Sequence, residues 1–159
     1  MKTTMQFIFF VFCTLNSFCQ TDPISTNGIA IGSFDPVSYF TTGHAVKGTD
    51  SYQTKINNIS YLFSSAANQK LFEDNPTKYI PQYEGYCALA VSYGKKISID
   101  PETFKIIDGK LYLFYNKKVG LRKVNSLDTW NKSEARLLKK ADELWPKVST
   151  VKYVAGEDM

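Results

Sequence analysis

Cys87 and His44 are the residues of this 159-residue sequence whose side chains offer the most chemistry. The chain has a single histidine, and its two other cysteines, Cys13 and Cys19, lie close to the N-terminus. A thiolate near the start of a helix can act as a nucleophile or as a ligand for a soft metal ion. The apolar run 88–91 after Cys87 equally fits a buried structural cysteine that behaves as a small hydrophobe.

A catalytic or metal-binding thiol would need a partner, and His44 is the one imidazole that the chain can supply. Cys87 with His44 is therefore the candidate metal pair, although two ligands fall short of a four-ligand zinc site. The sequence has no nucleophile elbow and no glycine-rich phosphate loop. These observations favour a non-catalytic binding module and leave a thiol-dependent enzyme or redox protein that uses Cys87 as an alternative.

Four residues are the candidate ligand-binding set. We expect a pocket between a first helical turn, the helix after Ser64 and the helix that carries Cys87. Its candidate lining residues are Asp35, Tyr39, Tyr86 and Cys87. The structural alternative assigns Asp35 to a helix cap and the other three to the core.

Two hairpins are predicted from turn residues between strand-like runs. Asn57 and Asn58 join the runs 52–56 and 59–63, and both tolerate a positive φ. Asp108 and Gly109 join 104–107 to 111–115, which is the strongest hairpin signal in the chain. A further short strand is expected at 28–32.

Helical patterns occur between and after these strands. We expect a single turn at 35–40, a helix from Ser64 or Ser65 to Asn75, a helix over 81–93, and the longest helix from Ser126 to Pro146. The last of these carries Trp130 on its apolar face. The pattern predicts an α+β fold, a small single domain with two β-hairpins and about three to four helices, the longest near the C-terminus.

The N-terminus has the features of an export signal. A positive charge at Lys2 precedes the apolar run 7–12, which is too short to span a bilayer. We predict a signal peptide at 1–19, a domain at 28–148 and a C-terminal tail at 149–159. The mature protein would be periplasmic or secreted, without a transmembrane segment, and a lipoprotein acylated at Cys19 is the alternative.

The amino-acid composition limits the classes of binding partner that the sequence predicts. Hydrophobic residues make up 43% of the chain and charged residues 21%, which is typical of globular domains. The formal charge of +4 is spread over separate lysine pairs such as Lys117-Lys118, so nucleic acid is not predicted as a partner. Ten tyrosines leave open a protein-interaction module with a tyrosine-rich surface. The expected partner is thus a small ligand or a protein.

Several of these motifs together resemble the YHS domain family, in its longer stand-alone exported form. They lie at 35–40, at 61–68, at Phe72, Asn75-Pro76 and Tyr79, at 81–88 and at 108–113. The resemblance spans about residues 29–148. Short modules of that family occur beside copper-transporting ATPases and some multicomponent oxygenases, and are considered to bind metal through cysteines.

The resemblance implies that the cysteine positions of the short modules are Ser38, Ser64 and Asn68 in this chain. It leaves a copper-like metal ion among the candidate cofactors. Hydroxyl and amide groups are poor ligands for a soft ion, however. We therefore expect the protein to fold without metal.

Export can be tested directly on the native protein. Cleavage after Cys19 should leave a mature chain that begins Gln20, Thr21, Asp22, Pro23, because small residues precede that bond at the positions that a signal peptidase inspects. N-terminal sequencing measures this. A mature chain that begins with a lipid-modified Cys19 would contradict it and establish the lipoprotein alternative.

Overall fold

A computed structural model describes residues 28–151 and residue 153. The predicted signal peptide and most of the predicted tail lie outside these residues. The described chain is a mixed α+β fold with three two-stranded antiparallel sheets and its longest helix near the C-terminus, as the sequence predicts. No helix in the described part of the chain is long and apolar enough to cross a membrane.

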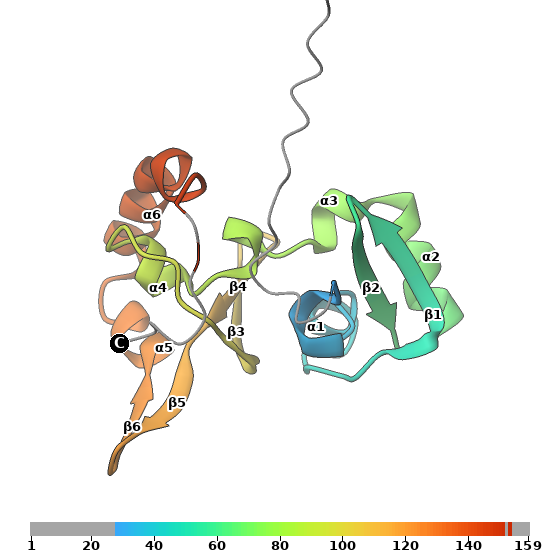
Figure 1. Cartoon of the computed structure of the whole chain (residues 1–159), viewed down its shortest axis with the longest axis horizontal. Coiled ribbons are helices and arrows are strands. Elements are labelled where there is room, and N and C mark those ends of the chain that lie inside the picture. The colour runs from blue at the N-terminus through green and yellow to red at the C-terminus, as the bar shows by residue number, and fades with distance from the viewer. Residues whose placement is uncertain (1–27, 152, 154–159) are drawn as a thin grey trace, which may run out of the picture.

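The first half of the described chain contains a hairpin and its covering helices (Figure 1). Its elements are a 3-10 turn at Ala30–Ser33, α1 (Ser38–Thr41), β1 (Thr49–Ile56), β2 (Ile59–Phe63), α2 (Ala66–Asp74) and α3 (Pro76–Tyr79). The Ser65 hydroxyl caps α2 by accepting the N–H of Asn68. Pro76 occupies the first position of α3, where its missing N–H costs no hydrogen bond.

The second half contains two hairpins and the C-terminal helices. Its elements are a 3-10 turn at Gln82–Gly85, α4 (Ala88–Val91), β3 (Asp100–Ile107), β4 (Lys110–Phe114), β5 (Asn116–Val119), β6 (Arg122–Asn125), α5 (Ser126–Asn131) and α6 (Glu134–Val148). In Figure 1 α4, α5, α6, β5 and β6 lie on the opposite side of the molecule from β1, β2 and α2, with β3 and β4 between the two sides.

The two predicted hairpins are confirmed. Asn57 and Asn58 adopt φ values of 49° and 66° between β1 and β2, and Asp108 and Gly109 adopt 50° and 72° between β3 and β4. These left-handed conformations suit asparagine, aspartate and glycine, which explains why the turn residues were informative. The third hairpin, β5–β6, was not predicted, because its strands carry charged residues without a period-2 apolar pattern.

The predicted helix over 81–93 is wrong. Tyr83, Glu84 and Gly85 have φ values of 55°, 53° and 82°, so the chain turns out of any right-handed helix before α4 begins. The predicted strand at 28–32 is also wrong, since Ile31 and Gly32 are left-handed within the 3-10 turn. Only Ile29 forms a bridge, to Ser60 of β2.

The predicted C-terminal helix exists as two helices. α5 ends at Asn131 and α6 begins at Glu134, and Pro146 lies within the last turn of α6 instead of closing it. The N–H of Ser133 bonds the carbonyl of Trp130, which closes α5 before the chain changes direction. The apolar spacing of the sequence continues across this break, so it did not reveal it.

Strand β4 lies between two core clusters. Leu111 and Leu113 belong to the first cluster, which also contains Phe63 and Phe72 of the first half. Tyr112 and Phe114 belong to the second cluster with Trp130. Successive side chains of a strand point to opposite faces, so a single strand serves both cores.

Trp130→Ala should destabilise the fold strongly. The Trp130 side chain is fully buried in the second cluster, between Tyr112 and Phe114 and the α6 helix. A large-to-small change of this kind costs about 3–5 kcal/mol of unfolding free energy. Urea denaturation followed by circular dichroism measures it. The exposed Tyr93→Ala is the control and should change stability by less than about 0.5 kcal/mol; equal losses in the two variants would contradict the assignment of Trp130 to the core.

Candidate functional site

Asp35 is fully buried and its carboxylate is surrounded by donors. Oδ1 accepts the N–H groups of Val37 (2.8 Å) and Ser38 (3.3 Å) at the start of α1. Oδ2 accepts the N–H of Ser64 (2.8 Å), the Ser64 hydroxyl (2.7 Å) and the Asn68 amide (2.7 Å). Val37, and not Asp35 as the structural alternative expects, is the N-cap residue of α1, but the Asp35 carboxylate binds the turn that leads into α1 and also the segment that starts α2.

The positions that the resemblance assigns to metal-binding cysteines gather around this carboxylate. Ser64 and Asn68 donate to Oδ2 directly, and the Ser38 hydroxyl lies 2.7 Å from the Asp35 carbonyl oxygen. Their polar hydrogens are directed at oxygen atoms inside the cluster. In this chain the three positions thus form a hydrogen-bonded cluster with Asp35, which leaves Asp35 no free face toward a ligand.

Tyr39 and Tyr86 are buried in different places. Tyr39 is in the first core cluster and donates its hydroxyl to the Pro101 carbonyl oxygen at 2.9 Å. Burial, with smaller contributions from Asp100 and Asp35, raises the pKa of Tyr39 well above its ordinary value, so the phenol stays protonated as a donor. Tyr86 is in the second cluster, with Lys96 Nζ 4.9 Å from its ring centroid. Tyr39, Tyr86 and Cys87 thus belong to three different core clusters.

His44 and Cys87 lie in different parts of the molecule. His44 is exposed on the loop after α1, whereas Cys87 is 2% exposed immediately before α4, and Figure 1 shows α1 and α4 in opposite halves. Within residues 28–151 and 153, no three histidine, cysteine or acidic side chains are close enough together to hold a metal ion. The described residues thus bring together neither the candidate metal pair nor a thiol–imidazole pair.

Cys87 does line a cavity, which has a volume of about 480 Å³. The lining residues come from α4, the loop after it, and the base of the β5–β6 hairpin: Cys87, Leu89, Ala90, Tyr93, Lys95, Ile97, Tyr115, Val124 and Ser126. Most of these side chains are apolar. Cys87, Ala90 and Tyr115 also form a small third core cluster, which is the inner wall of the cavity.

The polar groups of the inner wall bond to one another. The Ser126 hydroxyl lies 3.0 Å from the Tyr115 carbonyl oxygen and 2.9 Å from the Tyr115 nitrogen. Its hydrogen is donated to that carbonyl and its oxygen accepts that N–H. Cys87 Sγ is 3.3 Å from the same Ser126 oxygen. Cys87 therefore shares a buried hydrogen bond with the Ser126 hydroxyl.

The outer rim of the cavity is apolar and cationic. Tyr93 and Val124 are 57% and 38% exposed, and Lys95 is exposed beside them. Lys140 of α6 places Nζ 4.9 Å from the Tyr93 ring centroid. The lining contains no aspartate or glutamate. An apolar molecule with a negative charge at one end fits this arrangement of side chains.

Sequence reasoning identified Cys87 but missed the other walls of this cavity. Ser126 was predicted only as the start of the C-terminal helix, and Tyr115 and Val124 carried no recognisable motif of a binding site. They belong to a segment far along the chain that reaches Cys87 through the pairing of Cys87 with Leu113 of β4. Such a contact depends on tertiary structure and leaves no local pattern.

The described residues form a small α+β domain with an apolar, cation-rimmed cavity beside Cys87. Comparisons with protein-family models, with curated proteins and with solved structures find no match to this chain.

Asp35→Ala should destabilise the protein by at least about 3 kcal/mol, because it leaves several buried donors without an acceptor. Thermal and urea denaturation measure the loss, and the exposed Asp50→Ala is the control.

A chelator should leave the melting temperature of the unmodified protein unchanged, because N–H and O–H groups already satisfy the carboxylate. A lower melting temperature with chelator would show that a metal holds the cluster.

Proposed function

We propose that this chain is an exported, non-catalytic binding module of the YHS type that holds a small apolar molecule with one anionic group. The observation that carries the proposal is the cavity between α4 and the base of the β5–β6 hairpin. The family assignment is supported by the motif residues Asp35, Ser38, Ser64 and Asn68, which cooperate in one cluster.

The size of the cavity supports a small molecule as the ligand. Binding sites for small molecules typically measure about 300–1,000 Å³, with mainly apolar walls and a few polar groups that set the orientation. The volume of about 480 Å³ falls in this range. Leu89, Ala90 and Ile97 provide the apolar contact, and the hydrogen-bonded Ser126 hydroxyl is part of the inner wall.

The charge at the rim supports an anionic group on that molecule. Lys95 is the one charged residue in the lining, and Lys140 lies close by on the Tyr93 ring. Because Lys95 is exposed, its attraction to an anion is screened by water and contributes modestly to affinity. Lys95 would therefore influence the orientation of the ligand more than its affinity.

The arrangement at Cys87 supports binding over thiol chemistry. A nucleophilic thiol needs a base that takes its proton, and the hydrogen-bond partner of Cys87 Sγ is the Ser126 hydroxyl, which is not a base at neutral pH. A different observation argues against the alternative of a protein-interaction module with a tyrosine-rich surface. Seven of the ten tyrosines are buried, and Tyr93 is the only exposed one of the ten. The tyrosines therefore build the cores and do not form a surface.

The anionic dye 8-anilinonaphthalene-1-sulfonate should bind the folded protein with increased fluorescence, since it combines an apolar ring system with one negative charge. Ala90→Phe should weaken this binding on the order of tenfold, because the added ring occupies the cavity. Lys95→Gln should weaken it by about twofold to fivefold. Fluorescence titration measures both effects.

Two matched variants serve as controls for that titration. Ala135→Phe adds the same ring to an exposed position of α6, and Lys139→Gln removes a charge elsewhere on that helix. Neither should alter the affinity for the dye. Equal losses in the cavity and control variants, or dye binding that Ala90→Phe leaves intact, would disprove binding in this cavity.

Alkylation of Cys87 provides a second readout of the same prediction. Iodoacetamide should modify Cys87 far more slowly in the folded protein than in urea, because the side chain is 2% exposed. Saturating dye should slow the reaction further. Mass spectrometry of the peptide that contains Cys87 measures the rate. Modification as fast as in the unfolded chain would favour the alternative of a reactive thiol.

A further inference from the structure

The β5–β6 hairpin concentrates positive charge at one end of the molecule. Its residues include Lys117, Lys118, Arg122 and Lys123, and no aspartate or glutamate occurs from residue 109 to residue 127. The formal charge of these four side chains equals the net charge of the whole chain, +4. The rest of the sequence is therefore balanced, and the excess positive charge is located in this hairpin.

This clustering of positive charge could not be recognised from the sequence alone. Lys117-Lys118 looks like one of several separate lysine pairs. The hairpin places it beside Arg122 and Lys123, with Lys118 directly opposite Lys123 and Val119 opposite Arg122. Like charges directly opposite each other on neighbouring strands destabilise a hairpin. A pairing that costs stability in the isolated protein points to an anionic partner that reverses the cost.

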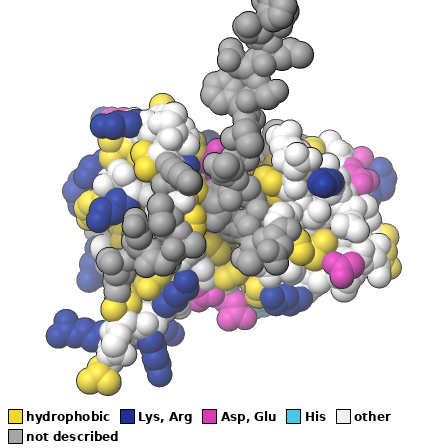
Figure 2. All heavy atoms as spheres, viewed as in Figure 1, with side chains coloured by type: hydrophobic (Ala, Val, Ile, Leu, Met, Phe, Trp, Pro, Cys, Tyr) yellow, Lys and Arg dark blue, Asp and Glu magenta, His cyan; other side chains and the backbone are white. Residues whose placement is uncertain are grey.

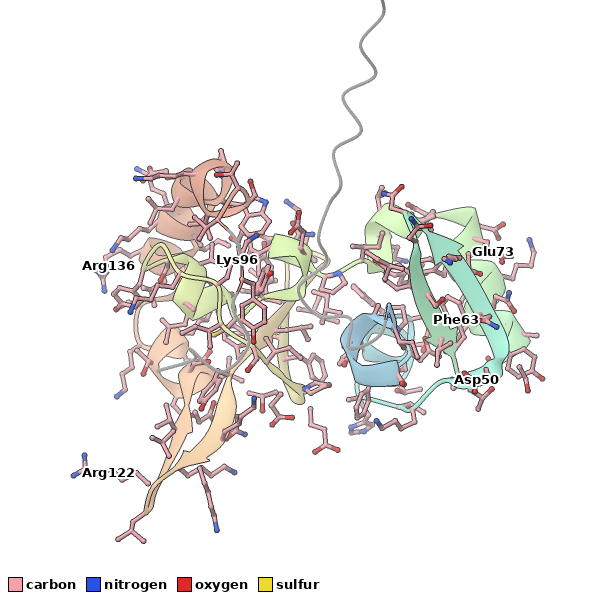
Figure 3. The ribbon with its side chains drawn as sticks, in the orientation of Figure 1. Asp50, Phe63, Glu73, Lys96, Arg122 and Arg136 are labelled. Carbon is pink, nitrogen blue, oxygen red and sulfur yellow. The ribbon has the colours of Figure 1, made fainter. Side chains whose placement is uncertain are left out.

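The cations at the far end of the hairpin are available for such a partner. Lys118, Arg122 and Lys123 are exposed, and none of them forms an ion pair with a carboxylate among residues 28–151 and 153. Lys117 differs, because its Nζ donates to the Ser98 hydroxyl at 2.8 Å and lies 5.5 Å from the Tyr115 ring centroid. Figure 3 shows Arg122 pointing away from the body of the protein.

The tip of the hairpin is aliphatic. Leu121 has a relative exposure of 106%, the highest of the exposed large hydrophobic residues in the structure. The tip extends beyond the other elements in Figure 1, and Figure 2 shows Lys and Arg side chains on both sides of an apolar end. A solitary leucine held away from the core at the end of a hairpin gives no stability to the fold.

An aliphatic tip between cations fits a lipid surface that carries negative charge. Cations near such a surface are attracted by the anionic headgroups, and an apolar side chain between them gains by entering the boundary of the acyl chains. A nucleic acid backbone or an acidic peptide would match the cations but would leave Leu121 in water. We propose that the β5–β6 hairpin docks this protein onto an anionic lipid bilayer, with Leu121 inserted and Lys118, Arg122 and Lys123 at the headgroups.

Co-sedimentation with vesicles tests the proposal on the whole protein. Vesicles of phosphatidylcholine mixed with phosphatidylglycerol should bind it, vesicles of phosphatidylcholine alone should not, and added salt should weaken the binding. Each cation near an anionic surface is worth a factor of about five in affinity, so the double variant Lys118→Gln with Lys123→Gln should bind about 25-fold more weakly. Leu121→Ser should also reduce binding.

Matched control variants distinguish vesicle binding through the hairpin from a general effect of positive charge on the protein surface. Lys139→Gln with Lys147→Gln removes two exposed charges from α6, and Leu71→Ser replaces another exposed leucine, which lies on α2. These should bind vesicles like the unmodified protein. All of the altered side chains are exposed, and circular dichroism should show unchanged folding. Equal loss of binding in the control and hairpin variants would overturn the proposal.

A tryptophan placed at the tip of the hairpin tests whether the tip inserts into the bilayer. In Leu121→Trp, the added tryptophan emission should shift to the blue with mixed vesicles and stay unshifted with phosphatidylcholine alone. Emission that stays unshifted while the protein sediments with the mixed vesicles would refute insertion of the tip. Tighter binding to a polyglutamate peptide or to duplex DNA than to the mixed vesicles would overturn the choice of a bilayer. These outcomes do not depend on dye binding in the Cys87 cavity.

Discussion

Burial of β4 on both faces is the constraint on which the rest of this structure depends. Leu111 and Leu113 pack into the first core cluster, while Tyr112 and Phe114 pack into the second. A strand buried on both faces tolerates no polar residue at any of these positions, and the sequence provides four apolar or aromatic side chains in succession. Neither half of the protein can bury its own apolar surface fully without this strand, so the two halves stabilise each other through it.

The two halves use their buried polar groups in opposite ways. In the first half, the Asp35 carboxylate accepts several hydrogen bonds and is fully buried, which offsets the cost of removing a charge from water. In the second half, Ser126 satisfies both backbone groups of Tyr115 at the wall of an open cavity. The first arrangement joins α1 to α2 through hydrogen bonds to one carboxylate, whereas the second borders an apolar cavity.

The sequence predicted the parts of the fold that local chemistry determines. Asn57-Asn58 and Asp108-Gly109 located two hairpins, and the pair Ser64-Ser65 located the start of α2 to within one residue, because each effect acts within a few residues. It failed where tertiary packing decides the conformation. Tyr83 and Glu84 adopt left-handed conformations that neither residue type favours, and the cavity forms from α4 and a distant hairpin. Of the candidate site residues, Cys87 alone lines that cavity.

The cavity and the hairpin share residues, which links the two proposals. Val124 belongs to β6 and also lines the cavity, and it is three residues from Leu121 at the tip. An extended strand covers about 10 Å over that distance. If the tip enters a bilayer to the depth of about 5–10 Å that is typical of interfacial segments, the rim at Val124 lies close to the lipid headgroups. A molecule with an apolar body and one anionic group gathers at the same boundary. The geometry then favours ligands that reach the cavity from the membrane surface over ligands that arrive through bulk water.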